Sequence, residues 1–186
     1  MTAQTERTRL RDPQSTTADR PEASTSTAFR YVTAALRLSL GWVFLWAFLD
    51  KMFGLGHATT HAQAWINGGH PTSGFLKKAA EGPFKGFYNG IAGAWWTDTL
   101  FMLGLAGIGI ALMAGIAMRF AAAAGSLLLI LMWTAVLPPA SNPFMDDHLI
   151  YAMVLVVLVL VGAGRFFGFG QAWERLPIVQ RYAFLR

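Results

Sequence analysis

A nearly unbroken apolar run from Tyr31 to Phe53 constrains this chain more than any other sequence feature. As a helix that rises about 1.5 Å per residue, the run is long enough to cross a hydrocarbon core of roughly 30 Å. Arg37 lies near one end of the run, and Asp50 and Lys51 lie at the other. The run therefore predicts a membrane-spanning helix that carries charged side chains.

The charges of this run fall on one side of the predicted helix. Positions 37, 41, 44, 48 and 51 recur at intervals of four and three residues, so their side chains share a face. Cations inside a membrane usually face the protein interior, so we expect Arg37 to lie inside the protein, with other spans packed around it. The alternative is snorkelling, in which a side chain extends to the headgroups; the sequence favours this for Lys51, at the end of the run.

Three further apolar runs follow. Hydrophobic residues make up 54% of the 186 residues and charged residues 13%, a balance that membrane insertion explains. We expect an all-α integral membrane protein, a four-transmembrane-helix bundle with a long extracytoplasmic loop between its first two helices. The predicted spans cover residues 31–53, 97–118, 120–137 and 147–166. In the second span Gly107, Ala111 and Gly115 stand four apart, which favours close approach of another helix.

The segments outside the spans differ in character. Residues 1–28 are polar and predict a disordered cytoplasmic tail, residues 29–170 form the membrane domain, and residues 171–186 form a cytoplasmic C-terminal tail. The outer loop, residues 54–96, is rich in Gly and aromatic residues. Helical spacing at 57–65 and a short turn at 74–81 predict a re-entrant or interfacial cap over the bundle.

The distribution of cations predicts the orientation. With the N-terminus inside, ten arginines lie on the cytoplasmic side and four lysines outside, which favours N-in and C-in in the plasma membrane of a prokaryote. The arginines are Arg7, Arg9, Arg11, Arg20, Arg30, Arg119, Arg165, Arg175, Arg181 and Arg186, and the lysines are Lys51, Lys77, Lys78 and Lys85.

The composition also argues against several kinds of site. The chain has no cysteine, so it has no disulfide, thiolate metal site or dithiol relay of its own. Its net charge of +5 is spread over the tail and span ends, so we expect no nucleic-acid partner. His57 and His61 are four residues apart, but no acidic residue is near them and no histidine lies in mid-span; we expect neither metal nor haem.

The densest polar cluster at a span boundary is Asp146, Asp147 and His148. An aspartate before a helix accepts hydrogen bonds from its free amides, and one aspartate is enough for that. The second aspartate and His148 are candidates for moving protons, because histidine titrates near neutrality. Helix capping alone and a protonation role both stay open at this point.

Several stretches resemble a known family. Residues 36–53, 142–152 and 162–165 are similar to DoxX-like membrane proteins and, more narrowly, to the DoxD branch, the membrane subunit of thiosulfate:quinone oxidoreductase. The resemblance covers about residues 34–170. It implies oxidation of thiosulfate to tetrathionate, with quinone as the co-substrate that accepts the electrons.

This resemblance sets the candidate residues. Arg37, Lys51 and Asn142 are the candidate substrate-binding residues, and Asp147 and His148 the candidate catalytic pair. A rival interpretation is a non-catalytic accessory subunit of a respiratory or oxidative-stress complex, and a third is transport of a small solute along a path lined by Arg37. The expected partners are the lipid bilayer, a second redox subunit or respiratory complex, and a second copy of the chain.

Overall fold

The computed structural model describes residues 26–182 and 185, and within that part of the chain every regular element is helical. Three helices are long and apolar enough to cross a membrane: α1 (Thr27–Phe53), α4 (Trp95–Ala114) and α5 (Met118–Ala135). A fourth apolar helix, α6 (Asp147–Leu160), has 14 residues, which corresponds to about 21 Å. The predicted all-helical fold is therefore confirmed, with three helices compatible with membrane spans, and the fourth span stays a prediction. Most of the predicted N-terminal tail lies outside the described residues.

The helix ends differ from the predicted spans where glycine stops a helix. α4 ends four residues before the predicted 118, because Gly115 takes the left-handed conformation (φ 74°) that suits a helix C-terminus. α6 ends six residues before the predicted 166, and Gly162 (φ 66°) follows it in the same conformation. The remaining residues form a 3₁₀ turn, η4 (Ala163–Arg165).

Two close helix pairs form the bundle, α1 with α4 and α5 with α6. A Cβ atom on Gly109 would lie 2.8 Å from the Leu45 amide nitrogen, so a side chain there would push α1 away. Gly125 allows similar closeness between α5 and α6, because its Cβ atom would lie 2.7 Å from Leu155 Cδ1. Gly107, predicted to lie at a helix contact, has no atom within 4 Å of an added Cβ. α4 therefore packs against α1 through the face that contains Gly109, and not through the predicted face that contains Gly107.

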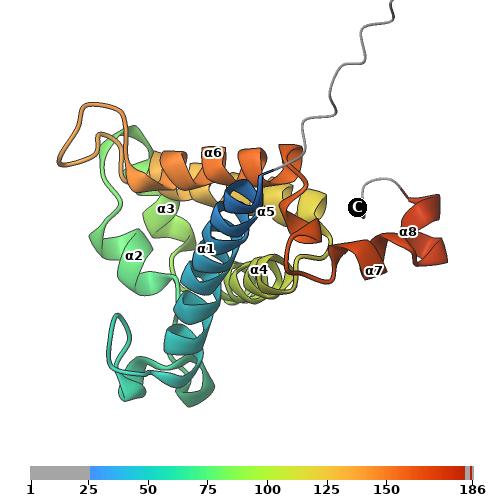
Figure 1. Cartoon of the computed structure of the whole chain (residues 1–186). Coiled ribbons are helices and arrows are strands. Elements are labelled where there is room, and N and C mark those ends of the chain that lie inside the picture. Colours follow the sequence, from blue (N-terminus) through green and yellow to red (C-terminus); the bar gives the residue numbers. More distant parts are fainter. Residues whose placement is uncertain (1–25, 183–184, 186) are drawn as a thin grey trace, which may run out of the picture.

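Short helices cover one end of the bundle and lie on the opposite side from the C-terminal helices α7 (Gly170–Glu174) and α8 (Pro177–Arg181), as Figure 1 shows. This cap consists of η1 (His61–Gln63), η2 (Trp65–Asn67), α2 (Ser73–Lys78), η3 (Gly82–Phe84) and α3 (Lys85–Ile91). It is joined to the end of α5, where the Glu81 amide donates to the Ala135 carbonyl at 2.9 Å. We refer to this end as the cap end, and to the end with α7 and α8 as the C-terminal end.

The prediction of a helix through His57 and His61 is wrong. Residues 57–60 are irregular, and two separate 3₁₀ turns follow. The reason is that Gly54 ends α1 in the left-handed conformation, and the Asp50 carboxylate then accepts hydrogen bonds from the His57 and Ala58 amides. These bonds tie residues 57 and 58 back to the end of α1, in the turn that follows it.

Candidate functional site

Arg37 is fully buried at the C-terminal end of the bundle, which confirms the predicted interior position. Its Nη1 atom donates to the carbonyls of Leu112 and Met113, near the end of α4. Its Nη2 atom donates to the carbonyls of Phe166 and Phe167, at 3.3 and 3.1 Å. Arg37 therefore joins α1 to α4 and to the segment after α6, and its predicted part in substrate binding stays a prediction.

These contacts complete the C-terminus of α4. The last four carbonyls of a helix have no partner within it. Here the Ala111 carbonyl accepts from the Gly115 and Ile116 amides, and the Ala114 carbonyl accepts from the Phe169 amide. Arg37 donates to the Leu112 and Met113 carbonyls, which lie between these two. A cation at this position also opposes the negative end of the helix dipole.

Asp50 and Lys51 lie at the other end of α1, and their environments differ. Asp50 is buried, and its two carboxylate oxygens accept from the His57 and Ala58 amides at 3.2 and 3.1 Å. Asp50 therefore fixes the start of the outer loop. Lys51 is half-buried and stays the candidate cation at this end of the helix.

The structure assigns different positions to the three polar residues at the start of α6. Asp146 caps the helix by accepting from the Leu149 amide at 3.2 Å, and its other oxygen lies 2.6 Å from His148 Nδ1. Asp147 is 69% exposed, and its carboxylate lies 3.5 Å from the same nitrogen. The ligand atoms of these residues all lie within 4.8 Å of one another, so a metal ligand set is geometrically available. The expected absence of metal and the catalytic roles stay predictions.

Asn142 shapes the loop before α6. Its side-chain oxygen accepts from the Phe144 amide at 3.0 Å and from the Met145 amide at 2.9 Å. This is a common way for asparagine to stabilise a turn. The described contacts of Asn142 are therefore local, and they do not join it to Arg37 or Lys51.

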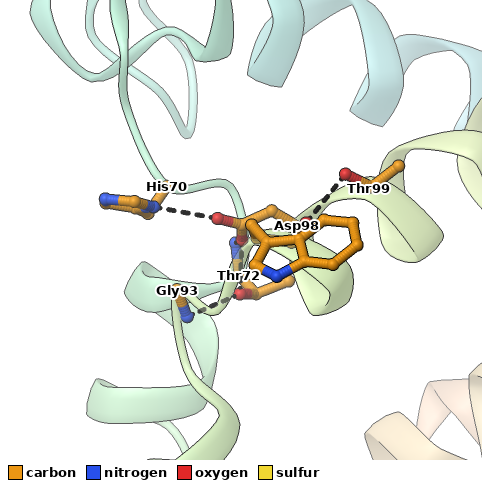
Figure 2. A network of polar contacts seen from close by, with 6 residues as sticks. His70, Thr72, Gly93, Asp98 and Thr99 are labelled. Atoms are coloured by element: carbon orange, nitrogen blue, oxygen red, sulfur yellow. Dashed lines mark hydrogen bonds and ion pairs between the residues drawn. The ribbon is translucent and has the colours of Figure 1, made fainter.

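A polar network under the cap was not identified as a site from the sequence. Asp98, in the first turn of α4, is buried and accepts from the Thr72 amide at 3.0 Å and the Thr72 hydroxyl at 2.6 Å. Its other oxygen lies 2.9 Å from Nδ1 of His70, whose side chain is 60% exposed. The Gly93 amide donates to Thr72 Oγ1 at 3.0 Å. Figure 2 shows these residues gathered around Asp98.

One sequence signal points to this network. Asp98 is a single carboxylate at the start of an apolar span, and a buried carboxylate needs hydrogen-bond donors. The sequence cannot say which of the four histidines supplies one, because the donor lies 28 residues away in an irregular loop.

An apolar groove of about 430 Å³ lies between α4 and α5, and Thr72 of this network is one of its lining residues. It follows one face of α4 from Thr97 to Ile108, a distance of about 17 Å along the helix. Its edges are open, since the Leu100 side chain is 63% exposed and that of Leu127 60%. Other lining residues are Phe101, Gly104, Ala124, Leu128, Leu131 and Met132.

Residues that carry hydroxyl groups lie at the cap end of the groove. Thr72 and Tyr88 of the cap line it together with Trp96 and Thr97 of α4. The Thr97 hydroxyl is buried and has no hydrogen-bond partner among the described residues. The Tyr88 hydroxyl donates to the Leu131 carbonyl at 2.9 Å. The groove is thus almost entirely apolar, with residues that carry hydroxyl groups at its cap end, which suits a ligand with a long apolar tail.

Comparison with known proteins gives no relative for this chain. No family model, no curated protein and no solved structure matches it.

Proposed function

We propose that this chain is a membrane redox subunit that oxidises thiosulfate to tetrathionate and passes the electrons to quinone. The observation that carries the proposal is the groove between α4 and α5, with its apolar floor and with Thr72, Tyr88 and Thr97 at the cap end. The choice of thiosulfate follows the resemblance to the DoxD branch.

The groove suits a membrane quinone. An isoprenoid tail is an apolar chain that reaches a protein through the lipid, and the exposed edges at Leu100 and Leu127 offer that route. The quinone head group carries two carbonyl oxygens that need donors. Thr97 lines the cap end of the groove, and its hydroxyl, buried and without a described partner, would become a donor on rotation of the side chain toward the groove. The groove volume falls in the range typical of small-molecule sites.

Thiosulfate would act at the same end of the molecule. It is a dianion, and the candidate cation Lys51 lies at the cap end of α1, while Lys77 and Lys78 belong to α2 in the cap. Fixed cations attract such an anion and raise its local concentration. The reaction joins two thiosulfate ions through a new bond between their sulfurs and releases two electrons, which reduce one quinone. A second redox subunit is the proposed route for those electrons.

The proposed topology places the cap on the outer side of the plasma membrane and both termini on the cytoplasmic side, with α6 as a fourth span. The distribution of charges supports this orientation. Besides the buried Arg37, the described cations at the C-terminal end of the bundle are Arg30, Arg119, Arg165, Arg175 and Arg181, and those at the cap end are Lys51, Lys77, Lys78 and Lys85. Arginine and lysine are enriched on the cytoplasmic side of membrane proteins, and the arginines in the predicted N-terminal tail add to that side.

Two glycines of α4 provide a matched test of the groove. An added Cβ at Gly104 would meet only Leu128 Cδ2, at 3.8 Å, and one at Gly107 would meet nothing within 4 Å. Gly104 lines the groove and Gly107 does not. Gly104→Phe should therefore fill the groove, whereas Gly107→Phe places the same ring outside it.

The assay is thiosulfate-dependent reduction of decylubiquinone by the protein with its native partners. Gly104→Phe should raise the KM for decylubiquinone at least tenfold, and Gly107→Phe should leave it near the wild-type value. Equal KM values for the two variants would remove the groove from the quinone site. A folded wild-type protein that reduces no quinone would favour the accessory-subunit interpretation.

A further inference from the structure

The polar network under the cap connects the groove to the outer surface of the molecule. Thr72 lines the groove and donates its hydroxyl proton to Asp98, which is only 2% exposed. Asp98 in turn bonds to the exposed His70 at 2.9 Å. An ionisable group on the surface is thus joined to the groove through one buried carboxylate and one hydroxyl, without a gap longer than a hydrogen bond.

We propose that His70, Asp98 and Thr72 form a proton path that serves the quinone in the groove. This inference rests on the proposed function, in which reduction of one quinone to the hydroquinone consumes two electrons and two protons. The electrons come from two thiosulfate ions as they form the sulfur–sulfur bond of tetrathionate. The protons come from outside water through His70, so atoms and charges balance.

Each proton moves in three transfers. Protonated His70 gives its Nδ1 proton to Oδ2 of Asp98, and His70 is then protonated again from water. The neutral carboxyl turns about its Cβ–Cγ bond, which brings this proton from the His70 side to the Thr72 oxygen on the Oδ1 side. The Thr72 oxygen takes the proton as its own hydroxyl proton passes to the reduced quinone oxygen, which returns Asp98 to its charged form.

The Thr72 hydroxyl is held in position for this transfer. Its oxygen accepts from the Gly93 amide at 3.0 Å while its proton points to Asp98 at 2.6 Å. An added Cβ on Gly93 would lie 2.4 Å from Ser73 Oγ and 3.4 Å from the His70 ring, so this position keeps the backbone close to the network. The residue types and the order of their contacts are those of a proton relay.

Other titratable groups belong to the elements packed around the network, and their described contacts lead elsewhere. The Tyr88 hydroxyl bonds to Leu131 and Thr134, His148 bonds to Asp146, and Asp50 bonds to loop amides. The remaining titratable or charged groups at the cap end are His57 and His61 of the loop, Lys51 of α1, Lys77 and Lys78 of α2, Glu81 before η3, Lys85 of α3 and Asp147 of α6, whereas Arg30 and Arg37 of α1 lie at the C-terminal end.

The test uses His70→Ala in the full chain with its native partners, because the exposed ring can be removed without opening the core. His61→Ala is the matched control, since His61 is an exposed histidine of the same loop. With thiosulfate as donor and decylubiquinone as acceptor, His70→Ala should lower kcat at least tenfold with an unchanged KM for decylubiquinone. Added imidazole should restore the rate, and His61→Ala should resemble the wild type in rate and pH profile.

The outcomes separate the two proposals. If the wild type reduces decylubiquinone and His70→Ala keeps its rate and pH profile, the proton path is overturned and the proposed function stands. A loss of rate with a raised KM and no rescue by imidazole also overturns it, because such a result indicates a structural role. If the wild type shows no turnover, the proposed function fails and the path fails with it.

Two substitutions at Thr72 give a second, independent test of the proton path. Thr72→Ser keeps the hydroxyl and should keep the rate, whereas Thr72→Val removes it and should lose the rate at least tenfold. Thermal unfolding of both variants shows whether the cap is intact. Equal rates in two folded variants would remove Thr72 from the path.

Discussion

Replacing Arg37 by methionine tests whether this buried cation holds the C-terminal end of the bundle together. Methionine keeps most of the apolar stem and removes the guanidinium. The change leaves the Leu112 and Met113 carbonyls, at the end of α4, and the Phe166 and Phe167 carbonyls without their donor. The prediction is that the variant folds with markedly lower stability.

The expected magnitude follows from those contacts. A buried polar group that loses its partner costs about 1–3 kcal/mol. The Leu112 and Met113 carbonyls have no other described donor, whereas removal of a buried charge recovers part of the cost of its desolvation. The net loss should be roughly 2–5 kcal/mol, and at about 2–4 °C per kcal/mol for a chain of this size, Tm should fall by on the order of 10 °C.

The assay is thermal unfolding of the detergent-solubilised protein, with Arg30→Met as the control. Arg30 belongs to the same helix and touches the same segment, because its guanidinium lies 5.7 Å from the Phe166 ring and 5.9 Å from the Phe167 ring. Its side chain is exposed, so such contacts contribute only about 0.5–1 kcal/mol. Equal Tm values for the two variants would refute the role assigned to Arg37.

Two further predictions concern α6 and the topology. Asp146→Ala removes the helix cap and the partner of His148, so the free energy of unfolding measured in urea should fall by about 1–2 kcal/mol. Asp147→Ala changes an exposed carboxylate and should alter this free energy by no more than about 0.5 kcal/mol. A larger loss for Asp147→Ala than for Asp146→Ala would contradict the assignment of the cap. Because the chain has no cysteine, single cysteines at Ser141 and Gln180 report the side of the membrane. A membrane-impermeant thiol reagent should label position 141 but not position 180 in intact cells, and labelling only of position 180 would reverse the proposed orientation.

The sequence alone determined the helices and much of their lengths. A span must satisfy its backbone hydrogen bonds within itself, so a long apolar run specifies a helix by local properties. The interior position of Arg37 also followed from the sequence, because its spacing to Gly41 and Phe44 defines one face, and all three are buried. The ends of α4 and α6 were less predictable, since Gly115 and Gly162 stop helices within apolar runs.

The tertiary structure decided which distant residues meet. Arg37 bonds to carbonyls 75 to 130 residues away, and His70 meets Asp98 across 28 residues of loop and helix. No local period encodes such pairs, because they depend on how the helices pack and on where glycines let backbones approach. The groove also depends on helix packing. α5 contacts α4 at Gly125 and Ile108, and the groove lies between the same two helices on the cap side of this contact. Apolar periodicity specifies each helix, but only the packing of helices against one another creates a groove between them.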